Sequence, residues 1–343
     1  NTRCARRVAL TLDISGLDWL RIKVRAINNK RRGYLIWIQM ANSLFPPESS
    51  RGHFAVYHCQ FPFDGQRRLM DSDGGILRLS TYNIVYLNSR YTASWYRKFI
   101  TSERRNFVQR HGFAPTLPPV THFPPPFEPL GTSKQKDFRS VRIVLIGRFF
   151  DGRQGKHHLD AIKAFEKLSS SHSIYKTSGD MSLTLIGNLA TGQKKYLRKV
   201  RSAVKAVHGV KLLVGISRKR LVSVLEDSNI VWSITGMDNN EADDPADAEH
   251  FGIALLEAMS TGMIPLVLNK GGPVEIVDQF PKYLLISTVT ELAESTSRLL
   301  QNSLSDLREL SQRARATARE MNIFHKEFDY MFNILGIRLT PDN

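Results

Sequence analysis

Short apolar runs alternate with helix-patterned segments through the second half of the chain. The runs are VRIVLIG, LTLIG, VKLLVG, NIVWSIT and MIPLVL, which begin at residues 141, 183, 210, 229 and 263. Each run is short enough for a buried strand. Helical patterns lie between them at 157–169, 193–207, 217–226 and 252–261. This alternation predicts an α/β fold with a parallel sheet and right-handed crossovers.

The first half repeats this pattern less completely. Residues 34–41, 54–61 and 83–89 are predicted strands, and 95–112 is a predicted helix. The proline-rich segment 114–136 is a poor helix or central strand, so we expect a linker or interdomain crossover there. The predicted domain boundary lies near Ser133. The C-terminal run 304–335 has a helical period.

Charge and cysteine content restrict the class of protein. The formal net charge is +16, from 48 basic and 32 acidic residues, and such a surface attracts phosphates of nucleic acid, lipid headgroups or nucleotides. No nucleic-acid-binding motif is recognisable, so nucleic acid is not expected as a partner. Two cysteines make neither a disulfide framework nor a zinc site, which favours a reducing compartment.

The sequence contains no apolar run of about 18 residues and no recognisable signal peptide. A cytoplasmic location is therefore expected. The chain begins at Asn1 rather than at methionine, so we expect the native N-terminus to be missing.

The segment GRFFDGRQGKHHLDAI, 147–162, follows a predicted strand and opens a predicted helix. Gly147 lets the backbone approach a ligand closely, and Arg148 and Lys156 supply cations beside a helix N-terminus. This chemistry suits a diphosphate. The spacing is neither that of a Walker A loop nor G-x-G-x-x-G, and an ordinary βα loop with surface charges is the alternative.

The segment EHFGIALLEAMSTG, 249–262, places two carboxylates eight positions apart. Gly252 opens a helix whose free amides and dipole suit an anion. Glu249 precedes that helix and Glu257 lies in its early turns, so both can reach one pocket and accept hydrogen bonds from sugar hydroxyls. The alternatives are a helix-start charge for Glu257 and membership of an acidic, solvated loop at 237–250 for Glu249. That loop lacks the EF-hand glycine, so no metal site is expected.

These motifs together resemble the retaining, GT-B-fold glycosyltransferases of family 4, whose donor domain is the group 1 glycosyl transferase domain. The resemblance rests on Glu-x7-Glu in EHFGIALLEAMSTGMIPLV, with GRFF…GKHH upstream and NKGGPVEIV downstream, and it covers 141–335. QFPFD and LNSRYT also resemble the end of the family's N-terminal domain.

The resemblance implies an α/β GT-B fold of two Rossmann-like domains facing a cleft. Residues 1–132 would form a shortened acceptor-side domain, because the family's first strand and glycine-rich loop are not recognisable. Residues 133–310 would form the nucleotide-sugar-binding domain. Residues 311–343 would form a C-terminal helix that packs back toward the first domain.

The resemblance also assigns roles to residues of the second domain. Arg148 and Lys156 would hold the diphosphate, with Gly147 beside them. Glu257 would bind the ribose hydroxyls, and Glu249 would meet the transferred sugar. Backbone contacts would come from Phe251, Gly252 and Ile253.

Transfer from a nucleotide-diphosphate sugar to a glycan or lipid-linked acceptor is the implied reaction, with retention of configuration. No metal or other cofactor would be needed, because cations and amides neutralise the leaving diphosphate. The alternatives are a catalytically silent relative that serves as a binding or assembly component, and a phosphate-binding α/β module of another class.

His58, at the end of a predicted strand, has two interpretations. Several family members place a histidine that touches the donor sugar at about this point, which would make His58 catalytic. The alternative is a core or strand-end histidine.

The segment 193–220 holds ten lysines or arginines and no acidic residue. One interpretation is a solvated helix face. The other is a surface that binds an anionic membrane peripherally, which would suit a lipid-linked acceptor.

Overall fold

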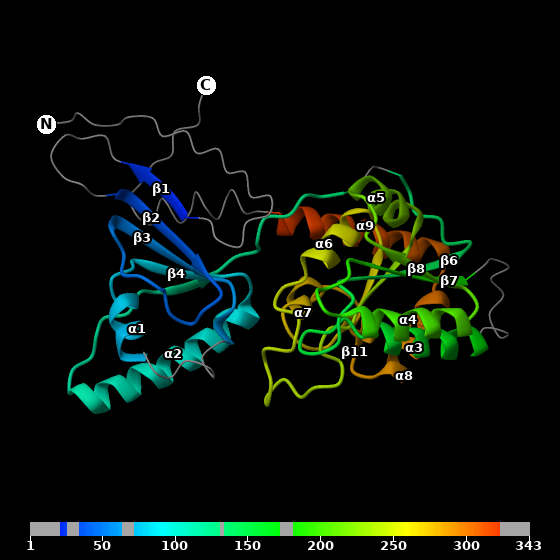
Figure 1. Cartoon of the computed structure of the whole chain (residues 1–343). Coiled ribbons are helices and arrows are strands. Elements are labelled where there is room, and N and C mark those ends of the chain that lie inside the picture. The colour runs from blue at the N-terminus through cyan, green and yellow to red at the C-terminus, as the bar shows by residue number, and fades with distance from the viewer. Residues whose placement is uncertain (1–20, 26–33, 64–71, 131–133, 172–180, 323–343) are drawn as a thin grey trace, which may run out of the picture. The chain divides into compact units, whose positions relative to one another are not determined.

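A computed structural model describes residues 21–25, 34–63, 72–130, 134–171 and 181–322 (Figure 1). The described residues divide into two compact units, one ending at Pro124 and the other running from Pro125 to Asn322. The break falls within the proline-rich segment, where consecutive prolines cannot continue either a helix or a hydrogen-bonded ladder. Each unit has its own sheet and its own hydrophobic core.

The first unit contains a five-stranded sheet in the order β1-β2-β3-β4-β5. Four strands run parallel, and β1 pairs antiparallel with β2. The elements are β1 Arg21–Arg25, β2 Tyr34–Ala41, β3 Gly52–Cys59, α1 Ser72–Leu79, β4 Ile84–Leu87, α2 Arg90–His111 and β5 Val120–His122.

Strand β5 lies inside the segment predicted to be a linker. It adds to the sheet beside β4 through the register Val85↔Val120, and no other described strand pairs with its far side. An edge position explains how three residues between prolines can serve as a strand, because only one side of the backbone must be paired.

The second unit contains a six-stranded parallel sheet in the order β11-β10-β9-β6-β7-β8. Its strands are β6 Val141–Ile146, β7 Met181–Gly187, β8 Val210–Val214, β9 Ile230–Ser233, β10 Ile264–Leu268 and β11 Leu285–Ile286. The five predicted strands of this half are confirmed within one or two residues. Strand β11 was not predicted, since only two residues take part.

Helices cover both faces of this sheet. On one face α3 packs against α8 and α4, and on the other α6 packs against α9 (Figure 1). The helices are α3 His158–Ser171, α4 Lys194–Ala206, α5 Arg218–Asp227, α6 Ile253–Ser260, α7 Pro273–Ile276, α8 Val289–Leu300 and α9 Leu304–Met321, with a 3-10 turn η4 at Lys282–Leu284. This is the doubly wound arrangement that strand–helix alternation predicts.

The expected C-terminal helix, 311–343, is described only in part. Residues up to Met321 belong to α9, which packs on α6 and β10 of the second unit, and Ser311 Oγ donates a 2.7 Å hydrogen bond to the Gly262 carbonyl. Residues 323–343 lie outside the described part of the chain.

A candidate nucleotide-sugar site at the switch point of the second sheet

The order in which strands are added to the second sheet reverses at the neighbouring parallel strands β6 and β9. From β6 the chain proceeds outward to β7 and β8, and it then returns to place β9 on the other side of β6. Such a reversal opens a crevice at the carboxyl ends of the two central strands, where the flanking loops part in opposite directions. The described strands of the first unit follow one another in order, so they contain no equivalent reversal.

A pocket of about 300 Å³ occupies this crevice. Its walls come from the end of β6, the loop that follows it, the end of β9 and the start of α6. Five of the predicted site residues line it together, namely Gly147, Arg148, Lys156, Glu249 and Gly252. Their sequence separation is large, and the reversal in strand order is what brings them to one place.

The pocket holds a lysine–carboxylate pair. Lys156 Nζ lies 2.5 Å from Glu249 Oε2 and 3.0 Å from Thr235 Oγ1. The two charged side chains are 22% and 26% exposed, so water screens the pair only partly. Burial opposes ionisation of Glu249, but the charge and hydrogen bond of Lys156 outweigh it and leave the pKa of Glu249 below its usual value.

Glycine is required where the Lys156 side chain crosses the loop. A Cβ on Gly147 would collide with Lys156 Cγ, and a Cβ on Gly187 would collide with the Gly147 carbonyl oxygen. The ends of β6 and β7 therefore meet through backbone at Gly147 and Gly187. This close approach lets Lys156 reach back over the end of its own strand to Glu249.

A buried carboxylate of the acidic loop accepts a hydrogen bond from the Lys156 loop. The Asp247 carboxylate, 3% exposed, accepts hydrogen bonds from the Gln154 backbone N–H and the Asn239 amide. Gln154 also has a left-handed backbone with φ 64°, which is uncommon for a residue with a side chain. The 237–250 loop was expected to be solvated. That expectation holds for its exposed first half and is wrong for 245–248, which are buried.

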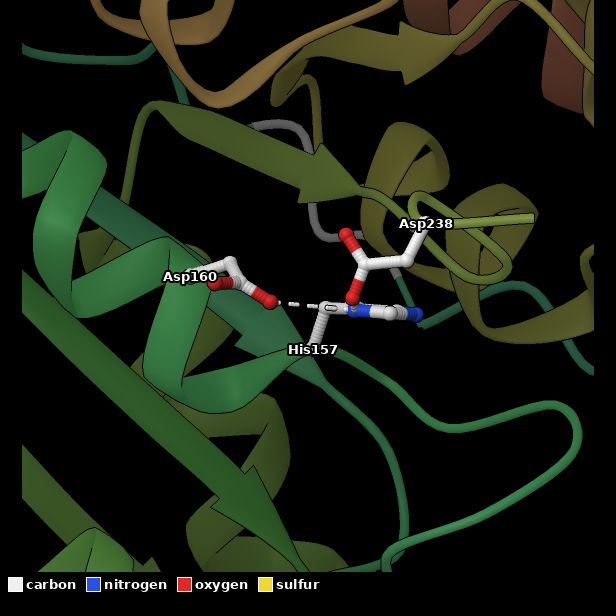
Figure 2. A group of neighbouring side chains, drawn as sticks. All are labelled: His157, Asp160 and Asp238. Atoms are coloured by element: carbon white, nitrogen blue, oxygen red, sulfur yellow. Dashed lines mark hydrogen bonds and ion pairs between the residues drawn. The ribbon is translucent and has the colours of Figure 1, made fainter.

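A second left-handed residue follows Lys156 directly. His157 has φ 52°, and its Nδ1 lies 3.1 Å from Asp160 Oδ2 and 3.5 Å from Asp238 Oδ2 (Figure 2). The His157 hydrogen bond, together with Lys163, lowers the pKa of Asp160 to about 2. The group ties the start of α3 to Asp238 of the acidic loop.

His157, Asp160 and Asp238 also offer ligand atoms within 4.8 Å of one another, close enough for one cation to contact all three. Lys163 Nζ already lies 2.9 Å from Asp160 Oδ1 and supplies positive charge there. Since internal partners account for the group, we assign it a structural role.

The start of α6 faces the pocket without a side-chain cap. Gly252 is the N-cap with φ 112°, and it makes no side-chain hydrogen bond to the helix. The first N–H groups of α6 therefore have no acceptor from the N-cap side chain, which suits a bound anion. Gly271 and Gly272 pack against the carbonyls of Glu249 and His250, where any Cβ would collide. This packing holds the Glu249 backbone at the pocket rim.

Not every predicted site residue lines the pocket. Phe251 is 4% exposed and belongs to the core, while Ile253 is 42% exposed at the helix start. Glu257 lies one turn further along α6, where its Oε1 accepts a 2.9 Å hydrogen bond from Arg218 Nη1. Arg148 does line the pocket, but it is exposed, and its guanidinium lies 5.5 Å from the Phe150 ring centre.

His58 belongs to the first unit, on β3. It is 4% exposed, with Nε2 2.8 Å from Asn88 Oδ1 and Nδ1 2.7 Å from the Tyr86 hydroxyl. Burial lowers the pKa of His58 to about 4, although the Asn88 hydrogen bond opposes this, so the ring is neutral at pH 7. This geometry is that of a buried strand-end histidine.

Three polar residues of the pocket, Gln154, Ser233 and Thr235, were not predicted from the sequence. Thr235 bridges to Lys156, and Gln154 lines the wall with its amide 3.1 Å from His250 Nε2. Thr235 could have been predicted from the sequence, because it lies just after β9. Polar residues at the carboxyl ends of parallel strands face the ligand crevice.

A family model described as "Glycosyl transferases group 1" matches residues 134–321, which is more than half of the chain and nearly the whole second unit. The chain belongs to this family. The matched segment contains the pocket and all of its lining residues.

Two curated relatives are similar over part of their length. Both are described as "GDP-Man:Man(3)GlcNAc(2)-PP-Dol alpha-1,2-mannosyltransferase". The Mus musculus protein is 27% identical over 202 residues, and the Dictyostelium discoideum protein is 27% identical over 168 residues. These matches cover 55% and 47% of this chain but only 37% and 30% of the relatives.

Solved structures with the same fold align with most of the chain. An alpha,alpha-trehalose-phosphate synthase (UDP-forming) from Burkholderia vietnamiensis has a TM-score of 0.58 at 12% identity, over 83% of this chain and 70% of that chain. Anabaena Alr3699/HepE, solved in complex with UDP and glucose, has a TM-score of 0.54 at 16% identity, over 80% and 71%. The chain thus has the expected α/β GT-B fold.

Proposed function

We propose that this chain transfers a sugar from a nucleoside diphosphate sugar to a lipid-linked glycan, with mannose from GDP-mannose as the donor sugar. The observation that carries the proposal is the Lys156–Glu249 pair in a pocket at the strand-order reversal. The similarity to GDP-mannose-dependent transferases that act on a dolichol-linked oligosaccharide supports the choice of donor and acceptor.

The donor diphosphate would replace the internal partners of the basic groups. Lys156 already points into the pocket, Arg148 lies at its rim, and the α6 N-terminus adds amide donors. In transfer, the bond from the sugar C1 to the diphosphate breaks and a bond from C1 to an acceptor hydroxyl oxygen forms. The nucleoside diphosphate departs with the electron pair and accepts the proton of the acceptor hydroxyl, and these positive groups stabilise its developing charge.

We further propose that transfer retains configuration and needs no metal. The curated relatives are alpha-1,2-mannosyltransferases, and GDP-mannose is itself an α-glycoside, so an α product corresponds to retention. Cations fixed in the protein would neutralise the diphosphate in the role that a divalent ion fills elsewhere. Glu249, held beside Lys156, would contact the transferred sugar.

A transfer assay tests the proposal. The full chain is incubated with GDP-mannose and a dolichol-pyrophosphate-linked oligosaccharide, with and without EDTA, and the product is digested with α-mannosidase. We expect an α-mannosidase-sensitive product in both conditions and none from a Lys156→Ala variant.

Two results would favour the other functions. Calorimetric binding of GDP-mannose without any transfer would indicate a catalytically silent relative. Failure of every nucleoside diphosphate and nucleotide sugar to bind would contradict the donor site altogether and favour a phosphate-binding module of another class.

A further inference from the structure

Helix α4 exposes a face built from basic side chains. Tyr196, Leu197 and Val200 are buried against the core of the second unit. The rest of the helix surface carries the six exposed residues that we call the basic face, Lys194, Lys195, Arg198, Lys199, Arg201 and Lys205. Its residues recur at three- and four-residue spacings, so their charges lie side by side along the helix.

The basic face lacks internal neutralisation. Among the described residues, no carboxylate lies within 4.0 Å of any of its six side chains. Elsewhere in the same unit, exposed cations such as Arg139 and Arg153 have aspartate partners at 3.0 Å. Six unpaired like charges on one short helix repel one another, and a bound external anion would reduce this repulsion.

A groove beside the basic face offers a place for one anionic group. It has a volume of about 350 Å³ and runs between α4 and β8, the terminal strand of the described sheet. Its lining residues are Arg198, Arg201, Ser202, Val204, Lys205 and Leu212. Guanidinium and ammonium groups suit a phosphate, and Val204 and Leu212 supply apolar contact for the carbon atoms attached to it.

We propose that the basic face docks on a membrane surface that contains anionic phospholipid, with one headgroup phosphate in the groove between α4 and β8. Clusters of four to eight lysines and arginines on an amphipathic helix are typical of such contacts. The only aromatic residue of α4, Tyr196, is buried, so the basic face lacks the stacking platform that single-stranded nucleic acid uses.

The proposed contact is electrostatic, and α4 does not insert into the bilayer. The apolar side of α4 packs into the protein core and is not free to enter a bilayer. Attraction between exposed basic residues and lipid phosphates falls off within a Debye length, so salt weakens it strongly. This proposal does not depend on the proposed transfer activity, and vesicle binding requires neither donor nor acceptor.

Co-sedimentation with vesicles tests the proposal on the full chain. Vesicles of phosphatidylcholine alone are compared with vesicles of phosphatidylcholine and phosphatidylserine, at low and at high salt. We expect binding only to the anionic vesicles and release at high salt. An Arg201→Glu/Lys205→Glu variant should bind at least about 25-fold more weakly, from roughly fivefold for each lost charge.

A matched variant distinguishes the effect of the basic face on vesicle binding from the effect of the protein's net charge. Lys219→Glu/Lys282→Glu changes two exposed lysines outside α4. It has the same total charge as Arg201→Glu/Lys205→Glu, which we call the groove variant. It should retain binding to anionic vesicles. Arg201→Gln/Lys205→Gln repeats the test without adding acidic residues, and thermal melting confirms that each variant is folded.

Three results would overturn the proposal. They are equal binding to neutral and anionic vesicles, equal weakening by the groove and matched variants, and binding to single-stranded RNA with no binding to anionic vesicles. If the full chain binds anionic vesicles but transfers no mannose, the proposed function is contradicted and the membrane proposal is not.

Discussion

At the scale of single residues, the pocket depends on one lysine that holds one carboxylate. Lys156 contacts Glu249 and Thr235, and no other lysine lines the pocket among the described residues. Without Lys156, burial would be left to raise the pKa of Glu249, so Lys156 governs the charge state of this carboxylate.

We expect Lys156→Ala to weaken binding of a nucleoside diphosphate by roughly 10- to 100-fold, the size of one hydrogen bond to a charged group. Calorimetry with GDP measures the loss. Lys163→Ala is the matched control, because Lys163 is a neighbouring exposed lysine that bonds Asp160 outside the pocket. Equal losses in the two variants would contradict the role of Lys156.

Arg218 is a second residue with a specific expected effect. Its guanidinium lies 2.9 Å from Glu257 Oε1 and 3.3 Å from Glu128 Oε2, so it fixes the carboxylate proposed to bind the ribose. We expect Arg218→Ala to weaken GDP binding roughly three- to tenfold, since a modest hydrogen bond is lost. Pyrophosphate, which lacks the ribose, should bind unchanged.

Arg220→Ala is the control for Arg218, since Arg220 is an exposed arginine of the same helical turn. Calorimetric titrations of both variants with GDP and with pyrophosphate give the comparison. An equal loss for both ligands would place Arg218 at the diphosphate rather than at the ribose carboxylate.

At the scale of elements, a buried lysine joins the start of the second unit to two helix ends. Lys136 is 5% exposed, and its ammonium donates to the carbonyls of Leu225 and Glu226 and to Thr261 Oγ1. Carbonyls at a helix C-terminus attract a cation, which accounts for a lysine at this place. Burial, with help from Arg315, nevertheless lowers the pKa of Lys136 to about 7.

This lysine makes stability depend on pH in a defined direction. The folded pKa lies below the unfolded value, so the unfolded chain binds more protons between about pH 7 and pH 10.5 and the free energy of unfolding rises with pH there. Relative to Lys136→Met, the native chain should gain up to roughly 1.4 kcal/mol per pH unit in this window. Urea unfolding at several pH values measures the difference, and a difference that does not vary with pH would contradict the assignment.

At the scale of the whole molecule, the candidate donor pocket belongs to one compact unit. All of its lining residues fall within Pro125–Asn322, which has its own six-stranded sheet and core. No helix in the described part of the chain has the length and apolar character needed to cross a bilayer.

We expect residues 125–322, expressed alone, to unfold cooperatively and to bind GDP as tightly as the full chain does. A unit of this size with a continuous core is of the kind that folds independently. Thermal melting and calorimetry provide the measurement. Transfer to the lipid-linked acceptor should be lost, since the family resemblance assigns the acceptor side to the first unit. GDP affinity that falls sharply in this fragment would show that the first unit contributes to the donor site.

The sequence by itself determined the local structure of the second unit and predicted its chemistry. Five apolar runs and their intervening helices are in place because burial of strands on both faces leaves a strong and unambiguous pattern. Glycines and charged residues at strand ends likewise indicated a phosphate-binding crevice. The short edge strands β5 and β11 were missed because few residues and one-sided pairing leave almost no pattern.

Only the tertiary structure decided which of these residues share a pocket. Strand order placed β9 beside β6, which brought Thr235 and Glu249 to Lys156 across large sequence separations. It also turned Glu257 toward Arg218 and buried His58 between Tyr86 and Asn88. Spacing along one chain fixes neighbours within a helix or strand, but contacts between elements follow from the order in which strands pair, which local patterns do not encode.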